Sequence, residues 1–352
     1  MSEEPRLHRL HARNNLYQRS LENMLRRWCV DDYPARAEAV WQRDYSSADA
    51  YVASVEPMRA RWKALLAPPD LKPTGDLSST PTDLVDQEGA RWLHLPLGSR
   101  DADEIGAEGI LALPSEGQGP FPVVIAQHGL GSFPEKAFGV GDPENVYHGW
   151  GRRMVAAGYA VLAPFNLSFT ESRNRVQRLA FIAGTTVRGI ELARLQRLLD
   201  VVLAMPEIDE QRVGMWGLSL GGMATQCFAP IETRIKVAIS AAWFNDRTRK
   251  MAVPDPRYTA FVESPESYMF IPGWLTAFAD EDLLSLMIPR ALMLQSGKAD
   301  GIAWWPDLLP VFERLRGHYV QLGLEDRVAL DLHEGVHEIR VETGLAFLKK
   351  HL

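Results

Sequence analysis

From residue 91 to the C-terminus, short apolar runs with strand character alternate with stretches that have the apolar periodicity of helices. The strand candidates are 92–97, 109–113, 122–127, 159–163, 212–216, 235–240, 290–295 and 328–332. The helix candidates are 145–157, 187–205, 223–228, 308–322 and 339–351. Strands covered by helices on both faces are apolar throughout, and repeated strand–helix alternation is typical of parallel sheets. The pattern therefore predicts an α/β fold with a mainly parallel, doubly wound sheet and helices on both faces.

The first 85 residues differ from the rest of the chain. Two helical stretches are expected at 3–30 and 34–66, followed by a segment rich in Pro, Thr, Ser and Asp at 67–82, which is typical of a linker. We therefore expect residues 1–85 to be a helical extension and linker, and residues 86–352 to be one α/β domain. Within that domain, 245–288 fits no strand–helix unit and is interpreted as an insertion near the mouth of a site. The N-terminal helices either cap an entrance or mediate contacts in a homo-oligomer.

Composition excludes several classes of protein. The chain has 352 residues, 46% hydrophobic and 24% charged, values that are ordinary for a globular protein. Its net charge of −7 argues against a nucleic-acid partner, and no apolar run is long enough to cross a membrane. The first residues lack the layout of a secretory signal, so a cytoplasmic location is expected. Cys29 and Cys227 have no metal-ligand or disulfide spacing and are interpreted as buried apolar side chains.

The pentapeptide Gly217-Leu218-Ser219-Leu220-Gly221 lies between a strand candidate and a helix candidate. This is the context of a nucleophile elbow, in which a serine hydroxyl is held on a sharp turn where a base can take its proton. A side chain at Gly217 or Gly221 would crowd that turn. Ser219 is therefore the predicted nucleophile, although a serine here could instead be an ordinary helix N-cap.

A serine nucleophile needs a base and an orienting acid, each of which should follow a strand. Asp300 follows the strand candidate 290–295, and His337 follows the strand candidate 328–332. The order Ser, Asp, His is that of the α/β-hydrolases. His333 is an alternative base, because it also lies beyond the last strand. Alternative acids follow earlier strands or lie in the insertion: Asp246, Asp280 and Asp282.

From about Trp62 onward the chain resembles the dienelactone hydrolase and acetyl xylan esterase-like branch of the α/β-hydrolase superfamily. The matching segments are Arg61 to Leu66, Gln127-His128-Gly129, Gly158 to Ala163, the elbow, Ile288 to Leu292, Gly297 to Asp300 and Gly335 to Glu338. Val336 and the sequence Asp300 to Trp305 depart from the usual pattern of the branch. These departures leave the three predicted residues in place but do not favour carbohydrate esters as substrates.

The resemblance implies a role for each residue. Ser219 is the nucleophile, His337 the general base and later acid, and Asp300 holds the imidazole. The backbone N–H groups of Leu130 and Leu220 form the oxyanion hole, and His128 braces the oxyanion loop. Phe133, Trp304 and Trp305 are candidates for contacts with the substrate, whereas the other tryptophans are expected to pack in the core.

The resemblance favours a serine esterase that cleaves short-chain acyl or acetyl esters through an acyl-enzyme, with a small-molecule ester as substrate and no metal or organic cofactor. One alternative is a peptidase of the prolyl oligopeptidase type, which has the same fold and order of residues. Such enzymes generally have a large N-terminal propeller, whereas only some 85 mostly helical residues precede the sheet here. A second alternative is a non-catalytic hydrolase-fold protein that binds a small ligand.

Overall fold

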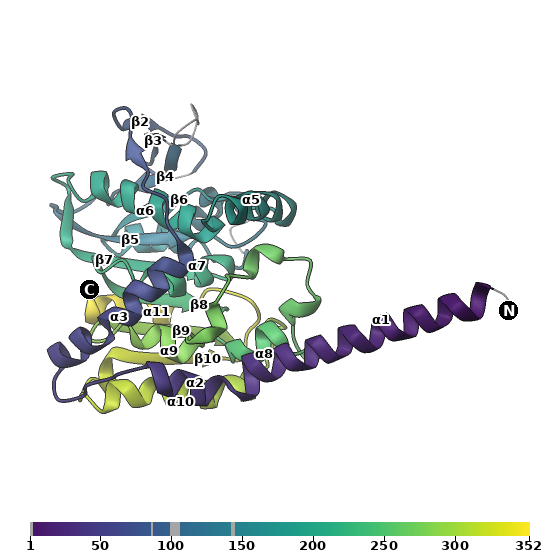
Figure 1. Cartoon of the computed structure of the whole chain (residues 1–352). Helices are drawn as coiled ribbons and strands as arrows, with labels where there is room; N and C mark the ends of the chain where they lie inside the picture. Colours follow the sequence, from purple (N-terminus) through teal and green to yellow (C-terminus); the bar gives the residue numbers. More distant parts are fainter. Residues whose placement is uncertain (1–2, 86, 99–105, 142–144) are drawn as a thin grey trace.

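A computed structural model describes residues 3–85, 87–98, 106–141 and 145–352. In these ranges, ten strands form one sheet with the order β1-β3-β4-β6-β5-β7-β8-β9-β10, and β2 pairs with β3 (Figure 1). The strands are β1 (Lys72–Pro73), β2 (Ser78–Pro81), β3 (Arg91–Gly98), β4 (Gly106–Ala112), β5 (Phe121–Gln127), β6 (Ala160–Pro164), β7 (Ile208–Leu218), β8 (Ile235–Ala241), β9 (Ala291–Gly297) and β10 (Val328–His333).

Six neighbouring strands pair in parallel, in the order β6-β5-β7-β8-β9-β10. The pairs among β1 to β4, and the pair of β4 with β6, are antiparallel. The mainly parallel sheet predicted from the sequence is confirmed. Because side chains alternate along a strand, β5 contributes Val123 and Ile125 to one hydrophobic cluster and Val124 and Ala126 to another. Both faces of this strand are therefore buried.

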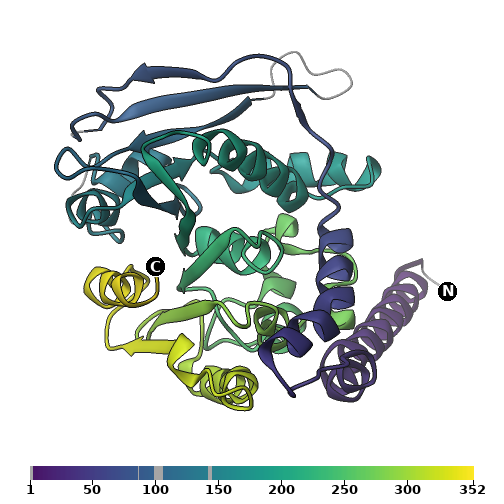
Figure 2. The same cartoon turned by 90° about the vertical axis from the view of Figure 1, so that its left-hand side faces the viewer.

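Helices cover each face of the sheet (Figure 2). One hydrophobic cluster contains residues of α3 (Ala48–Leu66), α6 (Val187–Val202), α7 (Leu220–Phe228) and α10 (Trp305–Val320). The other contains residues of α4 (Trp150–Ala156) and α11 (Val341–His351). The arrangement is the predicted doubly wound α/β fold, and it brings the C-terminal ends of the parallel strands to a common edge.

The N-terminal segment contains more elements than predicted: α1 (Glu3–Arg26), a π-helix η1 (Arg27–Asp31), α2 (Tyr33–Val40) and α3. The predicted helix 34–66 is wrong at 41–47, where the chain has no regular secondary structure. Local contacts explain the interruption. The Trp41 indole N–H donates to the Ala277 carbonyl at 2.8 Å, and the Ser47 hydroxyl caps α3 by accepting from the Ala50 N–H.

The segment 67–82 is not a simple linker. Its strands β1 and β2 pair antiparallel with β3 at the edge of the sheet. Pro73 and Pro81 are compatible with this position, because an edge strand has one side without a ladder of hydrogen bonds. The boundary predicted near residue 85 adjoins position 86, which lies outside the described residues. Leu66 and Leu71 belong to the same hydrophobic cluster as residues of the helices α6, α7 and α10, which cover one face of the sheet.

Three other expectations are corrected. Helix α4 begins at Trp150 rather than at 145, and α5 (Thr170–Ile182) was not predicted. Helix α5 directs Arg173 and Gln177 into the interior, so it lacks the apolar stripe by which a helix is recognised. Cys227 is buried as expected, but Cys29 is only half-buried.

The segment 245–288 contains only short helices: α8 (Arg247–Ala252), η3 (Phe261–Glu263), η4 (Ser267–Met269), η5 (Trp274–Thr276) and α9 (Asp280–Ser285). It contributes no strand within its described residues, in agreement with its irregular sequence pattern. None of the helices in the described ranges combines the length and the apolar character that crossing a bilayer requires.

Candidate active site

Ser219 occupies the sharp turn between β7 and α7. Its φ of 60° and ψ of −116° lie outside the regions that side chains other than glycine normally adopt. Hydrogen bonds hold the turn on both sides, since the Ser219 N–H donates to the Ala241 carbonyl and the Ser219 carbonyl accepts from the Met223 N–H, each at 2.8 Å. The surrounding structure therefore maintains a strained backbone at the predicted nucleophile.

The two glycines of the pentapeptide have a steric cause. A Cβ atom on Gly217 would lie 2.2 Å from the Gly221 carbonyl oxygen. A Cβ atom on Gly221 would lie 2.0 Å from the Gln127 carbonyl oxygen at the end of β5. Both distances are impossible for real atoms, and both obstacles are backbone. The turn can therefore form only with glycine at these two positions.

Asp300 and His337 meet although 37 residues separate them. Strands β9 and β10 pair in parallel with Gly297 opposite His333, so the loops that follow them leave the sheet side by side. The His337 Nδ1 atom lies 2.8 Å from the Asp300 Oδ2 atom. An ionised carboxylate can only accept, so Nδ1 carries the proton and Nε2 is left as an acceptor. This is the tautomer that a general base requires.

The loop that carries Asp300 is held by the segment 245–288. The Asp300 Oδ1 atom accepts from the Ile302 N–H at 2.9 Å, and the Ile302 carbonyl accepts from the Lys250 ammonium group. Lys250 is buried, and this burial, together with the nearby Arg247 guanidinium, lowers its pKa to about 7. The Thr259 N–H also donates to the carbonyl of Gly301, at 3.1 Å. These contacts place the insertion against the loop that presents the predicted acid.

His333 has other partners. Its Nδ1 atom accepts from the Gly335 N–H at 3.2 Å and lies 3.7 Å from a Glu338 carboxylate oxygen. Burial lowers its pKa. The structure thus brings His337 rather than His333 into contact with Asp300.

The alternative acids are also engaged elsewhere. Each of the three forms a hydrogen bond or ion pair away from His337: Asp246 caps α8 through the Arg249 N–H, Asp280 pairs with Arg247 at 2.7 Å, and Asp282 pairs with Arg43 at 2.6 Å. Burial raises the pKa of Asp280 despite its arginine partner. These contacts explain the three carboxylates as structural groups.

The loop after β5 lies against the elbow. A Cβ atom on Gly129 would be only 3.4 Å from the Cβ atom of Ser219. Next to it, the His128 ring is buried, with its Nδ1 atom 2.9 Å from the Gly129 carbonyl oxygen and its Nε2 atom accepting from the Asn166 N–H at 3.2 Å. Burial lowers the pKa of His128 to about 4, so the ring is neutral. His128 therefore braces the loop, as the sequence suggested.

The two predicted oxyanion donors belong to different segments, the helix that follows Ser219 and the loop after β5. Leu220 is the first residue of α7, and the N–H of such a residue has no partner within the helix. Leu130 follows Gly129, and its N–H makes no hydrogen bond with any other described residue. Neither N–H group therefore donates a hydrogen bond to another described residue outside the helix.

Aromatic side chains proposed for the substrate have different degrees of exposure. Phe133 is exposed and packs against the rings of Phe165 and Phe169. Trp304 is exposed beside the Arg257 guanidinium, and Trp305 is half-buried beside Lys298. Other aromatic side chains, which follow β8 or lie in the segment 245–288, are buried: Trp243, Phe244, Tyr268 and Trp274.

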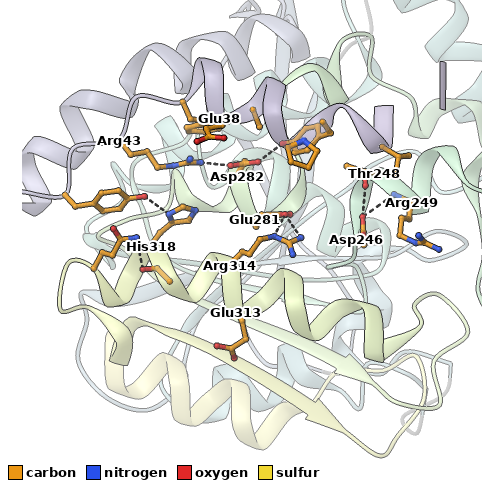
Figure 3. A pocket seen from close by; sticks show the side chains of 18 residues that line it. Glu38, Arg43, Asp246, Thr248, Arg249, Glu281, Asp282, Glu313, Arg314 and His318 are labelled. Carbon is orange, nitrogen blue, oxygen red and sulfur yellow. Dashed lines mark hydrogen bonds and ion pairs between the residues drawn. The ribbon is translucent and has the colours of Figure 1, made fainter. Parts of the chain in front are cut away.

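A cavity of about 920 Å³ lies away from these residues, between α2, α8, α9 and α10 (Figure 3). Two ion pairs line it: Arg43 with Asp282 at 2.6 Å, and Arg314 with Glu281 at 2.7 Å. Burial raises the pKa of Glu281 to about 7 in spite of Arg314. Ser219, Asp300 and His337 do not line it. The pair of Arg43 and Asp282 joins the N-terminal segment to the sheet domain, so the cavity is best explained as a polar junction between them.

Metal binding has no structural support in the described ranges, where no three His, Cys, Asp or Glu side chains come together as ligands. At the C-terminal ends of the strands, the structure presents Ser219 after β7, and the hydrogen-bonded pair of Asp300 and His337 after β9 and β10.

Comparison with known proteins gives distant matches. No model of a known protein family matches the chain. A curated protein of Bacillus subtilis, the candidate hydrolase YtaP, is 21% identical over 224 residues, which cover 60% of this chain and 72% of YtaP.

Among solved structures, a candidate acetyl xylan esterase from Bacteroides fragilis superposes with a TM-score of 0.65 at 16% identity, covering 84% of this chain and 80% of that one. A glucuronoyl esterase from Solibacter usitatus superposes with a TM-score of 0.56 at 15% identity, covering 84% of this chain and 93% of that one. Together with the sheet order and the elbow, these superpositions show that the chain has the α/β-hydrolase fold.

Proposed function

We propose that the protein is a serine hydrolase that cleaves carboxylic esters through a covalent acyl-enzyme. The observation that carries the proposal is the hydrogen bond between the Nδ1 atom of His337 and Asp300, found in the same molecule as the strained, positive-φ Ser219. A buried carboxylate that fixes the tautomer of a part-exposed imidazole leaves the Nε2 atom able to accept a proton from a serine hydroxyl.

In the proposed reaction, the Ser219 Oγ atom attacks the ester carbonyl carbon while the His337 Nε2 atom takes the hydroxyl proton. The C–O bond to the alcohol then breaks, and the imidazolium returns the proton to the departing alkoxide. Water repeats the sequence on the acyl-enzyme and releases the acid. The Leu130 and Leu220 N–H groups stabilise the oxyanion, and each such donor contributes about 3–4 kcal/mol to the transition state.

Short-chain acyl or acetyl esters are the proposed substrates, in line with the dienelactone hydrolase and acetyl xylan esterase-like branch that the motifs resemble. The names of the superposed structures, which are esterases, support the same reaction class. Phe133 and Trp304 are exposed and would contact the acyl or alcohol group. An esterase is preferred to a prolyl oligopeptidase-type peptidase, because the superposed structures are named as esterases.

The test combines an active-site label with a panel of substrates. A fluorophosphonate probe should label the wild-type protein and not Ser219→Ala, whereas Ser264→Ala, a serine in the insertion, should still be labelled. Activity should be measured on p-nitrophenyl esters from acetyl to octanoyl, on acetylated sugars, on a lactone and on a dipeptidyl anilide. Labelling that persists in Ser219→Ala would rule out this nucleophile, and absence of any label would favour a non-catalytic ligand-binding protein.

The choice of base is tested separately. His337→Ala should abolish both labelling and turnover, and His333→Gln should retain most of both. The reverse result would assign the base to His333. Faster cleavage of the anilide than of every ester would favour the peptidase.

A further inference from the structure

Helix α1 extends away from the rest of the molecule (Figures 1 and 2). It has 24 residues and is therefore about 36 Å long. All side chains from residue 6 to 25 are exposed. Only its C-terminal end is anchored, where the Arg26 Nε atom donates to the Ala252 carbonyl at 3.0 Å. Helices are stabilised in proteins mainly by packing of an apolar face, and α1 has no such packing within the described chain.

Most of the large apolar side chains of α1, together with Trp28 in the adjoining η1, follow a regular pattern, whereas Leu16 and Leu25 lie outside it. Intervals of three and four residues alternate along one line of positions, which we call the α1 seam: Leu7, Leu10, Asn14, Tyr17, Leu21, Met24 and Trp28. Six of the seven are large apolar side chains, and each of these is 46–71% exposed. A repeat of 3.5 residues is the signature of helices that pair in a coiled coil. Asn14 is the single polar residue of the seam, a device that sets register and oligomeric state in such pairs.

An apolar groove continues the α1 seam at the root of the helix. Its volume is about 350 Å³, and it lies between the last residues of α1 and the segment 245–288. Leu25 and Trp28 form one wall, and Met251, Phe270 and Leu275 contribute to the other. Apolar surface is thus continuous from the free end of α1 to the body of the molecule.

We infer that α1 pairs with α1 of a second copy of this chain, through the α1 seam. Each of the six apolar seam residues and Leu25 exposes roughly 100 Å² of side-chain surface, so one copy presents about 700 Å² of apolar surface. A standard stable interface buries roughly 800 Å² of surface per partner. The periodicity identifies the partner as another helix with the same repeat, and a second copy carries that repeat by definition.

The charges beside the α1 seam distinguish this partner from an anionic surface. From residue 6 onward, the charged side chains that flank the seam are Arg6, Arg13 and Arg27, all basic. In a pair of identical helices they repel one another, so added salt should strengthen the dimer. A basic helix that lies on an anionic membrane would instead bind less tightly in salt, and it would need a wider apolar face than a seam interrupted by Asn14.

The experiment measures the mass of the full-length protein by sedimentation equilibrium from low to high salt. The wild type should sediment as a dimer. The variant Leu10→Glu/Tyr17→Glu should dissociate at least about 100-fold more readily, because carboxylates would be buried in the seam. The matched control Ala12→Glu/Asn15→Glu adds the same charge on the opposite side of α1 and should remain dimeric. Leu21→Ser should weaken the dimer independently.

None of these side chains contacts the sheet domain, so the thermal unfolding of that domain and the ester hydrolysis proposed above should be unchanged. Any of three results would overturn the inference. The wild type could be a monomer, the Leu10→Glu/Tyr17→Glu variant could form an equally stable dimer, or the dimer could dissociate on addition of salt. Binding of a monomeric wild type to phosphatidylserine vesicles would do the same and would assign α1 to a membrane surface.

Discussion

The Nδ1 atom of His337 and the Oδ2 atom of Asp300 are 2.8 Å apart, although their loops follow different strands of the sheet. The Asp300 side chain is 3% exposed and that of His337 is 34% exposed. The acid is therefore shielded from water while the imidazole remains accessible, so a substrate can reach the ring without displacing its partner.

Replacement of Asp300 by Asn should reduce kcat by roughly 10³- to 10⁴-fold, because an amide can stabilise the wrong tautomer of His337. KM should change little, since Asp300 holds the base rather than the substrate. The matched control is Asp246→Asn, which removes a carboxylate that caps α8 and should retain nearly full kcat. Steady-state kinetics on the best ester of the panel measures both. A loss in the control equal to that in Asp300→Asn would contradict the assignment of the acid.

Gly221→Ala should destabilise the protein by about 3 kcal/mol or more and abolish activity, because its Cβ would meet the backbone of Gln127 at 2.0 Å. The control is Gly301→Ala, where no heavy atom lies within 4 Å of the added carbon. Urea denaturation of both variants gives the free energy of unfolding. Equal stability of the two variants would mean that the turn adapts more easily than its contacts suggest.

Glu191→Gln should cost about 3–5 kcal/mol of stability, because Glu191 is the shared ion-pair partner of Arg173 and Arg188 in the interior. Burial alone would raise the pKa of Glu191, but the two guanidinium groups outweigh it and lower the pKa to about 2. The stabilisation is therefore complete above the ordinary pKa of a glutamate, near 4.5, and is lost as the pH falls toward 2.

The control for Glu191 is Glu342→Gln, which removes a surface pair with Arg153 and should change stability by less than about 1 kcal/mol. Urea titrations at neutral pH compare the two variants. A Glu191→Gln protein as stable as the control would show that the buried arginines are satisfied by other means.

The buried His128 should make stability depend on pH. Its pKa is about 4 in the folded protein and 6.5 in an unfolded chain, so between these values only the unfolded chain binds the proton. Stability should therefore fall as the pH decreases from 6.5 to 4, by roughly 3 kcal/mol from this residue.

His128→Gln should remove that part of the pH dependence, as measured by urea denaturation at several pH values. Burial also lowers the pKa of His318, to about 3, but His318 is present in both proteins and its effect cancels in the comparison. If the free energy of unfolding of the variant depended on pH as steeply as that of the wild type, His128 would not be held neutral.

The central strands β5 and β8 could be predicted closely because their positions are recorded in local composition, whereas β1 and β2 lie in the segment that was expected to be a linker. The runs 122–127 and 235–240 are almost wholly apolar, and the observed strands β5 and β8 begin and end within one residue of them. Helix α5 could not be predicted in this way. Its inward face carries Arg173 and Gln177, which are accommodated only because Glu191 and the backbone of Leu167 and Val187 lie opposite them in the fold.

The sequence by itself determined the α/β class, the elbow around Ser219 and the order in which serine, acid and histidine occur, since these depend on residue type and spacing along the chain. Only the tertiary structure showed which acid and which histidine meet. Asp300, and not one of the three other carboxylates, contacts His337, and not His333. That choice depends on which strands pair and in what register, which are properties of distant contacts. The same is true of helix α1: its heptad spacing is present in the sequence, but only the fold shows that no part of the described chain covers it.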